Sequence, residues 1–195
     1  MPSKAASVFQ MRITLQHTDP PIWRVFKVSS DARLSHLHDV IQAVMGWEDC
    51  HLHEFVIAKQ RFGPAGDADG YIEDTGQADE DECLIRDVIG RSTRFHYVYD
   101  FGDNWNHDVK VEKALVPEEG VTYPVCTAGQ RACPPEDCGG AWGYQRLLEV
   151  LRDPSTEDYD EMVDWIGPEF DPERFDLAEI SARLAGLRPR RRRRK

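Results

Sequence analysis

The stretch TRFHYVYDFGDNWNHDVKVEKAL (93–115) decides the fold, because it joins two segments of alternating apolar and polar residues through a short polar turn. Gly102, Asp103 and Asn104 lie between the two segments and are residues that favour turns. The pattern therefore predicts an antiparallel β-hairpin. One side of its second strand is expected to face the core and carries Trp105, His107, Val109 and Val111.

Segments on the N-terminal side of the hairpin extend the predicted sheet. Alternation of apolar and polar residues predicts strands at 8–17, 22–28 and 53–63. Residues 34–46 have the apolar spacing of a helix, and Ser35 is its predicted N-cap.

The C-terminal part of the chain has the pattern of helices. Residues 144–167 contain two segments with helical spacing, and Asp176 with Glu179 predicts a capping box at the start of a last helix. We therefore predict an α+β fold in a single domain over residues 1–187. It contains a mostly antiparallel five-stranded sheet, one early helix and a helical C-terminal part.

The charge of the chain is unevenly distributed. Seven of its 24 basic residues lie in the last eight positions, RPRRRRRK (188–195), so residues 1–187 carry 17 basic against 35 acidic residues, a net charge of −18. Such a body repels nucleic acid over most of its surface, so any nucleic-acid binding is expected to be local.

The basic end, 188–195, is predicted to be a disordered tail that binds nucleic acid through phosphate contacts of arginine. The candidate residues are Arg190, Arg191, Arg192, Arg193 and Arg194. Two other interpretations stay open. A terminal run of like charge is often only a solvated tail, and this one is also able to lie on the acidic segment 66–82.

Two features of the sequence indicate the cellular compartment. No apolar run is long enough to span a bilayer, and the N-terminus lacks the apolar region of a secretory signal. Five cysteines without the spacing of a small secreted domain favour a reducing environment. We therefore expect a cytoplasmic protein that does not interact with membranes.

A first candidate site combines histidines and aspartates from two predicted strand ends. His51 and His53 stand at the start of one apolar strand face, and His107 stands near the start of another. With Asp100 and Asp103 of the hairpin turn they form a set suited to a metal ion or to acid–base chemistry. The alternative is that the aspartates only form the turn and that the histidines pair with carboxylates. Trp105 and Trp142 are the predicted walls of this site.

A second candidate site is the cysteine-rich segment after residue 115. Cys126, Cys133 and Cys138 lie within thirteen positions, among prolines and glycines that allow sharp bends. Three thiolates and one imidazole make a tetrahedral zinc shell, and His53 is the candidate fourth ligand, with His51 or Cys50 as substitutes. Against zinc, the CxxC pair usual in such sites is absent, and free cysteines often pack as small apolar groups.

Five segments carry a resemblance to a known family. They are PPIWRVFKV (20–28), LHDVIQAVMGWEDCHLHEF (37–55), YVYDFGDNWNHDVKVEK (97–113), GQRACPPEDCGGAWGYQRLLEVL (129–151) and FDPERFDL (170–177). In this order they strongly resemble the Ri-plasmid (pRiA) open-reading-frame-three-like family, whose members are also described as passenger proteins of insertion elements. The resemblance runs from about residue 8 to 187. It implies a single α+β domain and names no reaction.

Three hypotheses about function follow. The first is an accessory or binding protein of plasmids and mobile elements, with its site where the His51–His53 strand, the hairpin turn and the cysteine segment meet. The second is a metal-dependent hydrolase-like enzyme that uses the histidines and aspartates. The third is a nucleic-acid-associated protein that acts through its tail. Zinc is the candidate cofactor, and a protein or a nucleic acid is the candidate partner.

Overall fold

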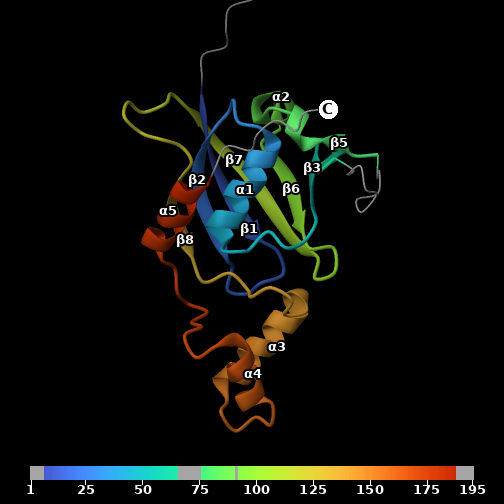
Figure 1. Cartoon of the computed structure of the whole chain (residues 1–195), viewed down its shortest axis with the longest axis vertical. Coiled ribbons are helices and arrows are strands. Elements are labelled where there is room, and N and C mark those ends of the chain that lie inside the picture. Colours follow the sequence, from blue (N-terminus) through green and yellow to red (C-terminus); the bar gives the residue numbers. More distant parts are fainter. Residues whose placement is uncertain (1–6, 66–75, 91, 188–195) are drawn as a thin grey trace, which may run out of the picture.

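One antiparallel sheet organises the computed structural model, which describes residues 7–65, 76–90 and 92–187 (Figure 1). Its strands are β1 Val8–Leu15, β2 Trp23–Ser29, β3 His53–Ile57, β4 Gln60–Gly63, β5 Ala78–Asp79, β6 Arg94–Tyr99, β7 Trp105–Leu115 and β8 Val125–Gln130. Their order across the sheet is β5-β4-β3-β6-β7-β1-β2-β8. Neighbouring strands pair antiparallel, except that β4 and β5 are parallel.

The helices divide into a group on the sheet and a group beyond its end. They are α1 Leu34–Met45, α2 Ile85–Ile89, α3 Gly140–Arg152, α4 Tyr159–Ile166 and α5 Leu177–Gly186, with a short 3-10 turn η1 at Glu80–Glu82. Helices α1 and α5 contact each other and lie across one face of the sheet, whereas α3 and α4 form an extension below it (Figure 1). The cysteine-rich loop links these two parts of the molecule.

The predicted hairpin is formed by β6 and β7. Tyr99 pairs with Trp105 at its closed end and Arg94 pairs with Lys110 at its open end. Trp105, His107 and Val109 alternate as buried residues along β7. The two-residue period therefore places this face of the strand against α1 and the core, as predicted.

The α+β class is confirmed, but the sheet has eight strands rather than five. The segment predicted as one strand at 53–63 is a hairpin of β3 and β4, in which Ala58 and Lys59 make the turn with φ of 49° and 70°. Such turns usually contain Asn or Gly, so the sequence gives no signal for it. The other two unpredicted strands are the two-residue β5 and the edge strand β8, a short glycine-containing segment in the predicted cysteine loop.

Two predicted helix starts have different outcomes. Asp176 caps α5 as predicted, because its side chain accepts hydrogen bonds from the backbone of Ala178 and Glu179. Ser35 does not cap α1: Arg33 is the N-cap, and Ser35 lies within the first turn and is buried. Arg33 instead forms a bridge with Leu84, and this contact fixes the entry into the helix without a side-chain cap.

Two parts of the sequence analysis concern residues that the structure does not describe. The tail at 188–195, with Arg190 to Arg194, lies outside the described residues, as does 66–75 of the acidic segment. In the described ranges, no helix has both the length and the apolar character needed to cross a membrane.

Candidate functional site

The turn between β6 and β7 holds Asp100 in a defined position. Asp100 and Asn104 have φ of 56°, the backbone of Asn104 donates to the Asp100 carbonyl at 2.6 Å, and the Asp100 backbone N–H donates to Leu52 at 2.9 Å. One carboxylate oxygen, Oδ1, accepts the Gly102 N–H at 2.8 Å. These contacts explain the turn, and they leave Oδ2 of Asp100 available to the residues before β3.

The loop after β8 is fixed to the tip of the same hairpin. Oδ2 of Asp103 accepts the backbone N–H of Gly139 at 3.1 Å. The start of α3 lies so close that a Cβ on Gly140 would be 2.4 Å from the Asp103 carbonyl oxygen. Asp103 is therefore a residue that positions the loop, although the sequence suggested that it belonged to the site itself.

These two junctions place the imidazole of His51 among three carboxylates. Its Nε2 atom lies 3.2 Å from Oδ1 of Asp137, 3.7 Å from Oδ2 of Asp100 and 3.9 Å from Oε2 of Glu136. The Nε2 atom is buried and has no hydrogen-bond partner. We call His51, Asp100, Glu136 and Asp137 the His51 cluster. It combines a strand start, a hairpin turn and the cysteine-rich loop, and is a mixed nitrogen and oxygen donor set.

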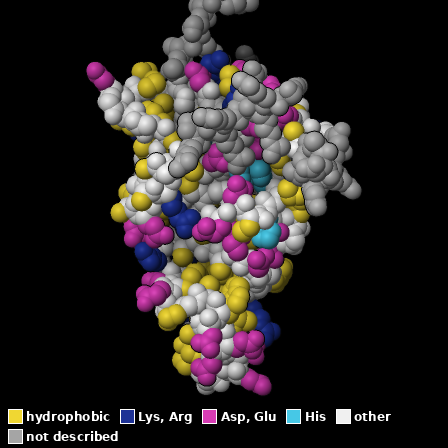
Figure 2. Space-filling model, viewed as in Figure 1, with side chains coloured by type: hydrophobic (Ala, Val, Ile, Leu, Met, Phe, Trp, Pro, Cys, Tyr) yellow, Lys and Arg dark blue, Asp and Glu magenta, His cyan; other side chains and the backbone are white. Residues whose placement is uncertain are grey.

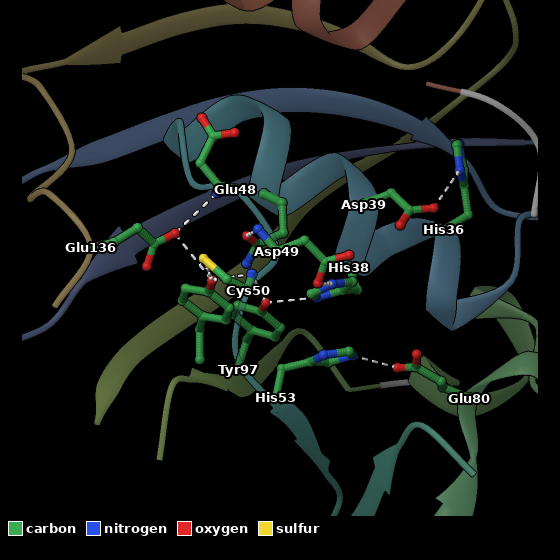
Figure 3. Close-up of polar contacts among 12 residues, drawn as sticks. His36, His38, Asp39, Glu48, Asp49, Cys50, His53, Glu80, Tyr97 and Glu136 are labelled. Atoms are coloured by element: carbon green, nitrogen blue, oxygen red, sulfur yellow. Dashed lines mark hydrogen bonds and ion pairs between the residues drawn. The ribbon is translucent and has the colours of Figure 1, made fainter. Parts of the chain in front are cut away.

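Only one of the two carboxylate oxygens of Glu136 accepts hydrogen bonds. Its Oε1 atom accepts the hydroxyl of Tyr99 at 3.1 Å and the backbone N–H of Glu48 at 3.0 Å (Figure 3). Its Oε2 atom is buried and unpartnered, and is the atom that faces His51. Burial raises the pKa of Tyr99, so its hydroxyl stays protonated and remains a donor to Glu136.

Cys50 lies at the edge of the His51 cluster. The thiol, His51 and Glu136 also offer donor atoms within 4.8 Å of one another, as do His51, Asp100 and Asp137. The backbone of Cys50 donates to the Tyr99 hydroxyl at 3.1 Å. Burial raises the pKa of this thiol, so at neutral pH it is a weaker ligand than the carboxylates.

The His51 cluster is partly open to water. The side chain of Asp137 is 73% exposed and that of His51 is 27% exposed, whereas Asp100 is buried. Figure 2 shows histidine side chains flanked by Asp and Glu side chains on this face of the protein. The carboxylates of Asp100 and Asp137 have oxygens within 4.8 Å of each other and repel one another, and a cation between them offsets the repulsion.

A second polar centre lies between α1 and the sheet and is buried except at Asp49, whose side chain is 48% exposed (Figure 3). Four hydrogen bonds form a closed ring. Tyr97 donates to Nδ1 of His38 at 2.8 Å, and Nε2 of His38 bonds Asp49 at 2.7 Å. The backbone of Asp49 donates to Gln42 at 3.0 Å, and Gln42 donates to the Tyr97 hydroxyl at 3.0 Å. Burial lowers the pKa of His38 and raises that of Tyr97, so both are neutral, as the ring requires.

His53 belongs to this buried centre and not to the His51 cluster. Its Nε2 atom lies 2.8 Å from Oε2 of Glu80, and its ring stacks on His38 with centroids 3.5 Å apart. His38, Asp49 and His53 also offer donor atoms within 4.8 Å of one another. His38 and Asp49 already use theirs in the ring, and His53 uses Nε2 for Glu80, so we interpret this centre as structural.

Three predicted site residues lie elsewhere. His107 is fully buried: Nδ1 is 3.2 Å from the Tyr97 carbonyl and the ring contacts Trp47. Trp105 is a buried core residue, and Trp142 is 85% exposed at the start of α3. None of the three contributes a donor atom to the groups described above.

The structure does not bring the three thiols of the predicted zinc site together. Among the described residues, Cys126, Cys133 and Cys138 do not form a group of three donor atoms within 4.8 Å, either with one another or with His53. Cys126 lies in β8, whereas Cys133 packs near Gly46. Burial raises the pKa of each thiol, and the pKa of Cys138 reaches about 12. They pack as neutral, mostly apolar groups.

Sequence reasoning located the meeting point but missed several of its residues. Glu136 and Asp137 lie in an irregular loop between Cys133 and Cys138, where no periodicity marks a side chain as pointing inward. The signal available was their place beside the cysteines. In the buried centre, Glu80 is hidden in a run of acids, and only its burial distinguishes it from its neighbours.

We expect Gly140→Ala to weaken the junction that builds the His51 cluster. The new Cβ would clash with the Asp103 carbonyl, and φ at this position is 68°, so the free energy of unfolding should fall by about 1–3 kcal/mol. Gly186→Ala at the end of α5 is the matched control, because its Cβ meets nothing within 4 Å. Urea unfolding of both variants measures the difference. Equal stabilities would show that the close approach at Asp103 is not maintained.

His107 should make stability depend on pH. Burial lowers its pKa to about 4, against 6.5 for a free histidine. Between these values the unfolded chain binds a proton that the folded chain does not, so stability falls as pH falls through this range. The loss should approach about 3 kcal/mol below pH 4. Urea unfolding from pH 7.5 to 4 should show a shallower dependence for His107→Leu. Parallel curves for the two proteins would contradict this assignment.

Comparison with known proteins places these features in a family. Residues 7–179 match the family model described as plasmid pRiA4b ORF-3-like protein. The chain is 39% identical over 164 residues to the uncharacterized protein y4hQ of Sinorhizobium fredii. The aligned residues make up 83% of this chain and 82% of that protein. It also resembles the crystal structure of MM3350, a protein of unknown function from Methanosarcina mazei Go1. The TM-score is 0.83 and the identity is 41%, over 91% of this chain and 99% of the other.

Proposed function

The chain belongs to the plasmid pRiA4b ORF-3-like family, and we propose that it is an accessory protein that binds a divalent metal ion at the His51 cluster. The observation that carries the proposal is a pair of buried atoms without hydrogen bonds, Nε2 of His51 and Oε2 of Glu136, which face each other at 3.9 Å. A buried polar atom without a partner is costly, and a metal ion would satisfy both.

The spacing of the donors supports a metal ion. Nitrogen and carboxylate ligands lie about 2.1 Å from zinc, so two ligands at a tetrahedral angle are about 3.4 Å apart. The three carboxylates lie 3.2–3.9 Å from Nε2 of His51, on both sides of this value. Nε2 of His51 lies within ion-pair distance of Asp137, at 3.2 Å, but makes no hydrogen bond to any of the three acids.

The donor types favour a first-row divalent cation. One imidazole with two carboxylates, the set that His51 forms with Asp100 and Asp137, suits zinc, manganese or iron(II), and these carboxylates disfavour an ion such as copper(I), which prefers thiolate ligands. Zinc is the ion to test first, because Cys50 is available as a soft ligand at the edge of the cluster. Asp100 would be an orienting ligand, since its other oxygen is fixed by Gly102.

A binding role fits the surroundings of the cluster. Leu52 and Phe101 follow His51 and Asp100 directly in the sequence, and their side chains are 44% and 49% exposed. Large apolar side chains next to a charged site are typical of surfaces that contact another protein. We therefore take a protein as the candidate partner.

A metal-dependent hydrolase is the second candidate. The observation in its favour is the exposure of Asp137, which leaves one side of the cluster open to water. A metal ion with an open coordination position lowers the pKa of bound water and generates a nucleophile. Metal-dependent hydrolysis of p-nitrophenyl phosphate that disappears in Asp100→Asn would favour this candidate over a purely binding role.

Elemental analysis of the purified, untagged protein tests the proposal. We expect close to one zinc, manganese or iron per chain, either as purified or after incubation with the metal under reducing conditions. A protein that retains none of these ions after gel filtration, in both preparations, would refute it.

A further inference from the structure

A cavity of about 530 Å³ lies between the extension and the sheet, away from the His51 cluster. It is bounded by the turn between β1 and β2, by the residue after β8, and by one side of α3. Arg131 and Tyr144 line it, and each is only 2% exposed. Ala141 and Leu148 provide an apolar part of the wall. The volume is in the range of small-molecule binding sites.

Hydrogen-bond donors in this cavity lack acceptors. Nε of Arg131 and the hydroxyl of Tyr144 are buried atoms without hydrogen-bond partners. Burial raises the pKa of Tyr144 to about 12, and the Arg131 guanidinium, within hydrogen-bonding range of the Tyr144 oxygen, opposes this rise. At neutral pH the hydroxyl therefore carries its proton, and this proton has no acceptor. Such buried donors are rarely left unpaired in folded proteins, so they point to an acceptor that comes from outside the chain.

The two arginines of the cavity differ in their partners. Arg131 forms an ion pair with Glu173 at 2.6 Å through its Nη1 atom. Its Nε atom is left without a hydrogen-bond partner. Arg152, in the last turn of α3, lines the same cavity, and within the described residues no hydrogen bond or ion pair is recorded for it. Two carboxylates, Asp19 and Glu149, also line the cavity and balance the two arginines, so an anion would be held by directed hydrogen bonds rather than by a net positive charge.

The backbone is strained at two residues of the cavity wall. His17 has φ of 61° and Arg131 has φ of 67°. Both values lie in the left-handed region, which residues other than glycine rarely occupy. Both residues line the cavity, from different strand ends. Strain of this kind persists where the surrounding structure holds a side chain in a required position, and it is common at ligand sites.

From the unpaired donors, the two guanidinium groups and the volume we infer that this cavity binds the oxyanion group, phosphate or carboxylate, of a small molecule. The oxyanion accepts hydrogen bonds from Arg131, Tyr144 and Arg152, and the rest of the ligand lies along Ala141 and Leu148 of α3. Arginine is suited to this role because its planar group binds two oxygens of one anion. The site is separate from the proposed metal site and does not depend on it.

Thermal unfolding and calorimetry of the full chain with inorganic phosphate and with benzoate test this inference. At equal ionic strength, at least one of the two should raise the melting temperature above its value in chloride. Stabilisation by phosphate alone, benzoate alone or both identifies the oxyanion class. If neither anion stabilises the protein relative to chloride, the inference is wrong.

Variants of α3 locate the binding. Tyr144→Phe removes only the hydroxyl. This variant and Arg152→Gln should each weaken binding of the stabilising anion, phosphate or benzoate, about tenfold. Arg146→Gln is the matched control, because Arg146 is on the same helix, pairs with Asp158 and does not line the cavity. Equal affinity of wild type, Tyr144→Phe and Arg152→Gln would place the anion elsewhere and overturn the assignment.

Discussion

Replacing His51 by alanine should abolish stoichiometric zinc binding, with a loss of affinity of about 100-fold or more. His51 is the only nitrogen donor of the His51 cluster, and the three carboxylates are arranged around its Nε2 atom. Without it the remaining oxygens are held apart by their own contacts. Even residues that only orient metal ligands typically contribute 10–100-fold in affinity, so loss of a ligand should cost at least about as much.

Calorimetric titration of zinc into chelator-treated protein measures this effect. Asp100→Asn should also weaken binding, because it keeps the turn contact through Oδ1 and removes the charge that faces His51. His36→Ala is the matched control: His36 is 24% exposed, close to the 27% of His51, and lies 3.7 Å from a single carboxylate, Asp39. If His51→Ala bound zinc as tightly as His36→Ala, the cluster would not be the metal site.

The second large effect is expected from Glu80→Ala, which should lower the free energy of unfolding by about 3–5 kcal/mol. Glu80 is 2% exposed and its partner His53 is 5% exposed, at a distance of 2.8 Å. Removing the carboxylate leaves a buried imidazole without its partner, next to the stacked ring of His38. The cost is therefore that of an unpaired buried group rather than the modest value of a surface ion pair.

Urea unfolding followed by tryptophan fluorescence tests this prediction. Glu118→Ala is the control, because it breaks an ion pair of similar length, 2.6 Å, whose acid is 58% exposed. It should change stability little. The double variant Glu80→Leu with His53→Phe should recover much of the loss, since apolar groups replace both members of the pair. Equal losses for Glu80→Ala and Glu118→Ala would show that Glu80 is not buried against His53.

The sequence was sufficient for features that depend on periodicity. Alternation along 93–115 located the hairpin, and the side of β7 that carries Trp105 and His107 is the buried side. The acidic cap Asp176 was also identified from its local pattern. These predictions succeeded because strand period and capping are properties of neighbouring residues.

Features that depend on contacts between distant segments were not predictable in the same way. The two histidines of HLH (51–53) look equivalent in the sequence, but His51 faces the loop carboxylates and His53 faces Glu80. His51 lies before β3, whereas His53 is its first residue and faces α1. His38 and Asp49 had no signal, because the hydrogen-bond ring forms only when α1 packs on β6. The thiols misled because three of them lie within thirteen positions, while their raised pKa values are those of thiols that pack as neutral groups.

The central claim, a metal ion at the His51 cluster, is tested most directly by anomalous diffraction from crystals soaked in zinc, recorded on both sides of the zinc absorption edge. We predict an anomalous peak within about 2.2 Å of Nε2 of His51, beside the carboxylates of Asp100 and Asp137. Zinc bound at another position, or an empty cluster with His51 hydrogen-bonded to one of these acids, would contradict the proposed function.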